Sequence, residues 1–267
     1  MANKIIDKPW EGVLEPACIF GNLYFVGTIS ASTHILKTDE GLIMFDSGYH
    51  ESLYIVLDNM YRLGLDPRDI KLILHTHGHI DHFGATPALI EMTGAKAGIG
   101  EPDKTYVTDE ENLSWADELE LPHRSFVPDF TYSDGDIISF GNAKIKCIAT
   151  PGHTPGTTTF VFDVTDGDQT LTACLLGGVG MNSMQKWFLD KYNLSDSTRK
   201  EFPKAMDKFG NIDADIFLGN HAMNNDTPSK LERLKKGETD AFICKGENKL
   251  FAEKIKKKYF DMLEEEK

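Results

Sequence analysis

The residues best suited to chemistry lie in one short stretch, Leu74-His75-Thr76-His77-Gly78-His79-Ile80-Asp81-His82-Phe83-Gly84. Histidine and aspartate supply the nitrogen and oxygen donors that zinc prefers. His77 and His79 are two residues apart, so in an extended or tightly turned segment their rings point the same way. Asp81 and His82 follow at once and can face a second metal ion. The two glycines of the stretch allow the backbone angles that such a loop needs.

Two further histidines extend this metal-binding cluster. His153 lies in the turn Ala149-Thr150-Pro151-Gly152-His153-Thr154-Pro155-Gly156, and His221 ends the run Leu218-Gly219-Asn220-His221. Each follows a predicted strand directly, and loops at strand ends often carry binding sites. A lone loop histidine is usually polar surface, but the neighbouring motif favours a ligand role for both.

The remaining histidines are predicted to have structural or surface roles. His34, His50 and His123 lie outside the motif and gain no support from it. His75 lies one residue before the cluster, but the apolar strand ahead of it is expected to bury it. We therefore predict that His75 supports the site or packs in the core rather than binding metal.

The elements that must position these residues alternate between strands and helices. Apolar periodicity predicts strands at 19–26, 33–38, 42–46, 70–74, 96–99, 136–140, 143–149, 157–163, 171–176 and 215–218. It predicts helices at 51–63, 85–92, 198–209 and 248–266. The segment 100–134 is predicted as a helix and a long loop, either bordering the site or making a plain surface excursion. No Pro/Gly/Ser-rich linker divides the chain, so we expect one α/β domain, 1–267, of two similar layered halves.

Composition excludes several classes of partner. The net charge of −14 disfavours nucleic acid and anionic membranes. No apolar stretch reaches the length of a membrane span or a signal peptide, which predicts a cytoplasmic protein as written, or a periplasmic or secreted one if a leader has been removed. Four widely and irregularly spaced cysteines predict buried, reduced thiols rather than a disulfide framework.

The motif His77-x-His79-x-Asp81-His82 resembles that of the metallo-β-lactamase superfamily. The likeness continues in 66–74, 93–96 and 152–158, which resemble the third subclass of metallo-β-lactamases, the one whose site is built only from histidine and aspartate. It runs from about residue 19 to the C-terminus. The resemblance implies the four-layer αββα sandwich of that fold.

Carried over residue by residue, the resemblance implies two zinc ions per chain. The first would be held by His77, His79 and His153, and the second by Asp81, His82 and His221. A zinc-bound hydroxide would attack the β-lactam amide bond of a small-molecule substrate, and Asp81 would be both a ligand and the catalytic residue that orients this hydroxide.

The sequence departs from related families after the strand that ends near Leu176. Many superfamily hydrolases, including glutathione thioesterases, carry an Asp that bridges both metals there, and the first lactamase subclass carries a Cys; this chain has neither. Serines that help to bind the lactam carboxylate in the third subclass are matched here by Gly178 and Gly180, the candidate substrate-binding positions. Ala214 stands where the usual disulfide partner of Cys244 would be, so that bridge is expected to be absent.

Three alternatives to β-lactam hydrolysis follow from these departures. A zinc hydrolase of lactones or other esters would use the same site. An iron-binding redox protein of the flavodiiron type would carry acidic residues in place of some histidines and an appended flavin domain, and this sequence shows neither. A nuclease would need a basic face, which a net charge of −14 disfavours. The residues favour the first of these three.

Overall fold

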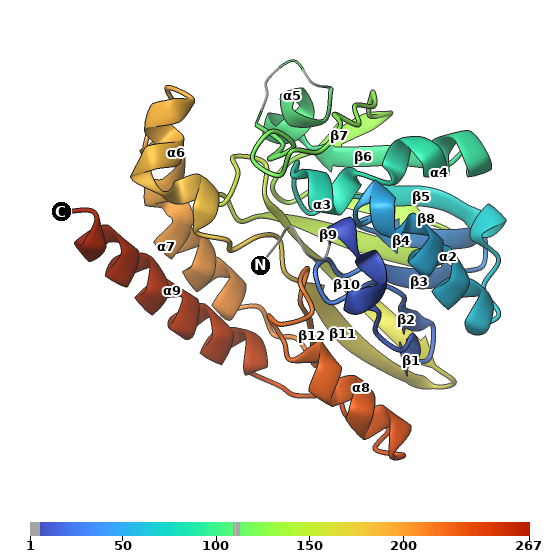
Figure 1. Cartoon of the computed structure of the whole chain (residues 1–267). Coiled ribbons are helices and arrows are strands. Elements are labelled where there is room, and N and C mark those ends of the chain that lie inside the picture. The colour runs from blue at the N-terminus through green and yellow to red at the C-terminus, as the bar shows by residue number, and fades with distance from the viewer. Residues whose placement is uncertain (1–5, 109, 111–112) are drawn as a thin grey trace.

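Two β-sheets face each other, and helices cover the outer side of each sheet (Figure 1). The computed structural model describes residues 6–108, 110 and 113–267. The strands are β1 Ala17–Phe20, β2 Leu23–Phe25, β3 His34–Thr38, β4 Gly41–Phe45, β5 Ile70–Leu74, β6 Lys96–Gly100, β7 Phe130–Tyr132, β8 Ile137–Phe140, β9 Ala143–Ala149, β10 Thr158–Asp166, β11 Gln169–Leu175 and β12 Ile216–Leu218. The helices are α2 Leu53–Arg62, α3 Ile80–Phe83, α4 Thr86–Thr93, α5 Lys104–Val107, α6 Lys186–Lys191, α7 Ser197–Gly210, α8 Thr227–Lys235 and α9 Glu247–Glu265.

The two sheets are built in chain order. The first sheet holds β1 to β7 side by side, antiparallel from β1 to β4 and parallel from β4 to β7. The second sheet has the order β12-β11-β10-β9-β8, and only β11 and β12 are parallel. Parallel neighbours need long crossovers. Helices α2 and α4 make two of these crossovers, on the outer face of the first sheet (Figure 1).

Three hydrophobic layers hold the four structural layers together. Between the sheets, Phe45 of β4 stacks on Phe162 of β10 with ring centroids 4.8 Å apart. Helices α2 and α4 bury Val56 and Leu89 against the first sheet. Helices α7 and α9 pack against the second sheet. The αββα sandwich predicted from the family resemblance is therefore confirmed.

Several of the strands and helices predicted from the sequence differ from those in the structure. The predicted strand 19–26 is two strands, because the chain turns at Gly21, whose φ is +49°. A Cβ there would lie 1.9 Å from the carbonyl oxygen of Thr165, so the neighbouring hairpin leaves no room for a side chain. Helices α3, α6 and α8 and strand β7 were not predicted. In the segment 100–134, residues 109, 111 and 112 lie outside the described residues.

Two expectations about the chain's environment can be compared with the structure. Among the described residues, no helix combines the length and the apolar character that crossing a membrane requires. All four cysteines, which lie among the described residues, are free. The prediction of thiols without a disulfide framework is confirmed, and Cys147 and Cys174 are buried as predicted. The predicted burial is wrong for Cys18 and Cys244, which are exposed.

The stack of Phe45 on Phe162 between the sheets predicts that loss of the Phe45 ring will strongly destabilise the fold. Phe45→Ala removes a fully buried ring and leaves a cavity, so we expect the free energy of unfolding to fall by about 3–5 kcal/mol. Urea unfolding followed by circular dichroism measures this change. Phe260→Ala is the matched control, because Phe260 is 49% exposed, and it should change stability by about 0.5 kcal/mol or less. Similar small effects for both variants would contradict the assigned core.

Candidate metal centre and cleft

Three loops at the carboxyl ends of strands bring the predicted site residues together. His77 and His79 follow β5, and Asp81 and His82 lie in the first turn of α3 directly after them. His153 comes from the loop between β9 and β10, and His221 follows β12. The first sheet supplies four of these side chains and the second sheet supplies two. All six lie in one cluster.

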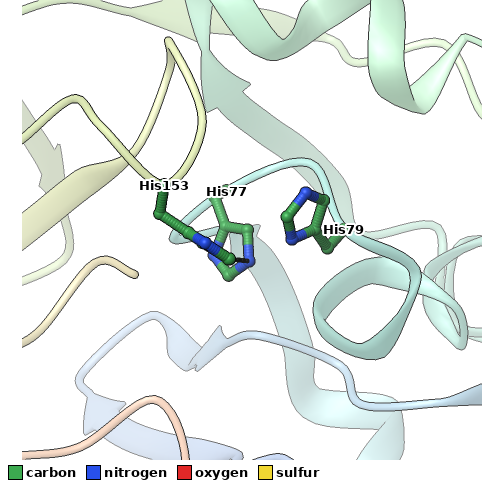
Figure 2. Close-up of side chains that lie close together, drawn as sticks. All are labelled: His77, His79 and His153. Carbon is green, nitrogen blue, oxygen red and sulfur yellow. Dashed lines mark hydrogen bonds between the residues drawn. The ribbon is translucent and has the colours of Figure 1, made fainter. Parts of the chain in front are cut away.

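The first part of the cluster is a group of three imidazoles. Nε2 of His153 lies 3.1 Å from Nε2 of His77, and the ring centroids of His79 and His153 are 4.5 Å apart. Figure 2 shows the three rings grouped between the loop after β5 and the loop after β9. Each ring can offer one nitrogen so that the three donor atoms lie within 4.8 Å of one another, and all three residues are buried.

The second part of the cluster combines one carboxylate with two imidazoles. Oδ2 of Asp81 lies 3.3 Å from Nε2 of His82 and 3.5 Å from Nε2 of His221. The two histidine Nε2 atoms are 3.3 Å apart. His77 adjoins this group, since its donor atom lies within 4.8 Å of those of Asp81 and His82. The two parts are therefore neighbours within a single centre.

Acceptors behind the rings determine which nitrogen faces the centre. Nδ1 of His82 lies 2.7 Å from Oδ2 of Asp46, and Nδ1 of His153 lies 2.7 Å from the carbonyl oxygen of Gly180. Nδ1 of His221 is hydrogen-bonded to the carbonyl oxygen of Ser30. A carbonyl or carboxylate accepts the N–H, so Nδ1 carries the proton and Nε2 presents a lone pair inward.

The electrostatics of the cluster suit a divalent cation. Burial, reinforced by the neighbouring imidazoles, lowers the pKa of His77 and His79 well below the ordinary value, which keeps their lone pairs free. Burial disfavours the charged form of Asp81, but His82, His221 and His79 hold its pKa far below the usual range. Nε2 of His79 is buried without a hydrogen-bond partner among the described residues. An unpaired buried nitrogen amid inward-facing lone pairs fits a cluster that binds metal.

His82 differs from the other imidazoles. Burial disfavours its charged form, but the carboxylates of Asp81 and Asp46 raise its pKa to about 10, so a cation that binds Nε2 of His82 would displace a proton there. Asp46 also accepts hydrogen bonds from the backbone N–H and the hydroxyl of Thr76, at 2.7 and 2.8 Å. One buried carboxylate thus holds His82 and the start of the histidine loop in place.

Two acids that shape this centre were missed by the sequence analysis. Asp46 follows β4 directly, and Asp103 ends the short 3-10 turn Glu101–Asp103 after β6. Both side chains are completely buried. The sequence feature that could have identified them is an acid just after an apolar strand, since β4 and β6 are the two neighbours of the strand β5 that precedes the histidine loop. A single acid has no periodicity, so the pattern did not distinguish these residues from surface carboxylates.

A cleft of about 410 Å³ opens onto the centre, a size that accommodates a small molecule. It is lined by Ser30, Tyr49, His79, Asp81, Trp115, Leu119, His153, Gly180, Asn182 and His221. Trp115 stacks on Phe188 of α6, with ring planes 7° apart, and this contact supports the apolar wall. Apart from the metal-centre residues, the described lining is uncharged.

The other histidines lie where the sequence predicted. His75 is buried, and its two ring nitrogens contact the carbonyl oxygen of Gly98 at 2.8 Å and the hydroxyl of Thr86 at 2.7 Å. His34 is buried edge-on against Phe25. His123 pairs with the carboxylate of Asp117 on a partly exposed surface. The core assignment of His75 and the structural or surface assignment of the other two are confirmed.

The two candidate substrate-binding glycines lie beside His153. Gly180 lines the cleft, but a Cβ on it would lie 2.6 Å from Oδ1 of Asn182. A Cβ on Gly178 would lie 2.5 Å from Cδ2 of His153. The metal-centre ring thus occupies the space that a serine side chain would need. A role of these glycines in substrate binding stays a prediction.

The comparison with known families agrees with this geometry. Residues 26–170, more than half of the chain, match the model of the metallo-β-lactamase superfamily. The chain therefore belongs to the metallo-β-lactamase superfamily. This membership supports a metal-dependent hydrolase.

Three individual proteins illustrate the similarity in structure and in sequence. The structure is similar to that of BJP-1, a subclass B3 metallo-β-lactamase of Bradyrhizobium japonicum, with a TM-score of 0.87, 26% identity and 97% of each chain covered. A β-lactamase hydrolase-like protein of Xylella fastidiosa is 37% identical over 34% of this chain and 21% of its own length. Hydroxyacylglutathione hydrolase GloC of Haemophilus influenzae is 33% identical over 35% of this chain and 44% of its own length. The chain thus spans less than half of these two curated relatives.

The crowding beside His153 leads to a prediction for Gly178→Ser. The new side chain must displace His153, so we expect reduced metal content and reduced activity rather than tighter substrate binding. Metal analysis of the purified protein after dialysis against zinc measures this effect. Gly64→Ser is the control, because nothing lies within 4 Å of a Cβ added to Gly64. Gly64 has a positive φ, and any backbone strain from this substitution is remote from the centre. Full metal content in Gly178→Ser together with a lower KM for a carbapenem would contradict the prediction.

Proposed function

We propose that this protein is a zinc-dependent hydrolase that cleaves the amide bond of β-lactams. The observation that carries the proposal is the pair of adjoining three-donor sets at the foot of one small-molecule cleft. The similarity to a subclass B3 enzyme over nearly the whole of both chains supports the choice of substrate.

In this proposal the cluster holds two zinc ions. His77, His79 and His153 would hold one, and Asp81, His82 and His221 would hold the other. Sets of three protein ligands leave a coordination position open for water and substrate, unlike closed structural sites with four protein ligands. Zinc bound in this way supplies Lewis acidity and a water molecule whose pKa falls towards about 7.

The protein's own side chains bind and orient the reactants. Asp81 stays ionised and lines the cleft, so its carboxylate can accept a hydrogen bond from the attacking water and orient that water. Trp115 and Leu119 offer an apolar wall to the substrate substituents, and this wall excludes water from one side. Tyr49 and Asn182 offer polar groups on the same cleft.

The second candidate is hydrolysis of lactones or other esters at the same centre. It is favoured by the uncharged lining of the cleft outside the metal centre, which offers no strong counterpart to the carboxylate of a β-lactam. One hydrogen bond to a charged group contributes about 1.5–3 kcal/mol. Its absence would weaken the binding of an anionic substrate roughly ten- to a hundredfold, while a neutral lactone would lose nothing.

A substrate panel separates the two candidates. Zinc-loaded protein is assayed with a carbapenem, a cephalosporin, N-acyl lactones and a glutathione thioester, and kcat and KM are measured for each. We expect turnover of the β-lactams with a high KM. Rapid lactone opening without β-lactam turnover would replace the first candidate by the second, and inactivity towards the whole panel in zinc-replete protein would refute both.

The role of Asp81 predicts a distinct kinetic effect. Asp81→Asn keeps the shape of the side chain but removes the charge that orients the water, so kcat and kcat/KM should fall together while KM changes little. Steady-state kinetics at matched zinc content measures this change. Asp163→Asn is the control, because Asp163 contacts the hydroxyl of Thr172 on an exposed part of the second sheet. A higher KM at unchanged kcat in Asp81→Asn would contradict the assigned role.

A further inference from the structure

Asp103 accepts three hydrogen bonds close to the centre, and none of them comes from a side chain of the two proposed metal-binding sets. Its Oδ2 accepts from the backbone N–H of Gly78 at 2.8 Å and from the hydroxyl of Thr154 at 2.6 Å. Its Oδ1 accepts from the backbone N–H of Gly156 at 2.6 Å. The side chain is fully buried, so these three donors replace water around the carboxylate.

The three donors belong to the two loops that carry the three-histidine set. Gly78 lies between His77 and His79, and Thr154 follows His153 directly. The first loop extends from the first sheet and the second loop from the second sheet. A single carboxylate therefore fixes the separation of two loops that no strand pairing connects at this point.

Gly78 and Gly156 leave room for the side chain of Asp103. A Cβ added to Gly156 would lie 2.6 Å from Cγ of Asp103, and a Cβ added to Gly78 would lie 3.2 Å from Cβ of Asp103. The backbones also meet nearby, where the N–H of Thr158 donates to the carbonyl oxygen of Thr76 at 2.8 Å. The packing leaves little freedom for another side chain at position 103.

We propose that Asp103 is a positioning residue of the three-histidine set: it holds His77 and His79 at the correct separation from His153, and so sets the zinc affinity of that set. The inference rests on the proposed metal centre. An asparagine has the same shape but carries an NH2 group in place of one oxygen, so it would face at least one donor with another donor. Loss of such supporting contacts typically weakens metal affinity about 10- to 100-fold.

The test measures zinc affinity in two backgrounds, by competition with a chromophoric chelator. His221→Ala leaves the three-histidine set complete, and His153→Ala leaves the Asp81, His82 and His221 set complete. Adding Asp103→Asn should raise the zinc Kd about 10- to 100-fold in the first background and leave it unchanged in the second. The double-mutant design isolates the coupling between Asp103 and one set of ligands.

Two further variants keep the result interpretable. Asp129→Asn is the matched control, because Asp129 accepts the N–H of Ala97 on β6 at 2.9 Å without touching either loop, and it should change neither affinity. If circular dichroism shows that Asp103→Asn does not fold, Thr154→Val tests the role of Asp103 instead. It removes one of the three donors and should weaken zinc binding in the first background alone, by a few-fold.

Two results would overturn the inference: equal weakening in both backgrounds, which a general loss of structure would cause, or no weakening in either background. Failure of the unmodified protein to bind zinc would instead refute the proposed metal centre itself. The two failures are therefore distinguishable.

Discussion

Five imidazoles and one carboxylate must converge with their lone pairs turned inward, and much of the structure around the centre serves this requirement. Buried imidazoles without a fixed partner could rotate or change tautomer. Here the outer nitrogens of His82, His153 and His221 are held by a carboxylate and two backbone carbonyls. These acceptors fix the tautomers, so the inward nitrogens remain available to bind a cation.

Convergence also depends on how the two sheets pack. The first sheet carries the histidine loop and the second carries His153 and His221, so a small slide between the sheets would pull the donor sets apart. Aromatic contacts between the sheets, led by Phe45 on Phe162, resist this sliding. Buried carboxylates then act closer to the centre, with Asp46 beneath His82 and Asp103 between the loops.

The sequence predicted the six clustered side chains better than it predicted the residues that hold them in place. Four of the six side chains lie within six residues, and the strand before them is a clear apolar run, so spacing alone indicated a metal motif. His153 and His221 were grouped with them because each follows a predicted strand directly, and only the division of the six side chains into two sets needed the family resemblance. The alternation of strands and helices predicted two layered halves, and the family resemblance predicted the four-layer sandwich.

What the sequence could not predict arises from contacts between distant segments. The need for glycine at position 21 is imposed by the carbonyl oxygen of Thr165, and the need for glycine at position 178 is imposed by the ring of His153. Asp103 gains its three hydrogen-bond donors only when the loop of Gly78 and the loop of Thr154 and Gly156 are brought beside it. Such requirements carry no periodicity in either segment, so they become visible only in three dimensions.

The most direct test of the account is anomalous diffraction at the zinc absorption edge from crystals of the zinc-loaded protein. The account predicts two strong peaks, one among His77, His79 and His153 and the other among Asp81, His82 and His221. A single peak, or peaks away from these side chains, would contradict the central claim that the cluster is a two-metal centre.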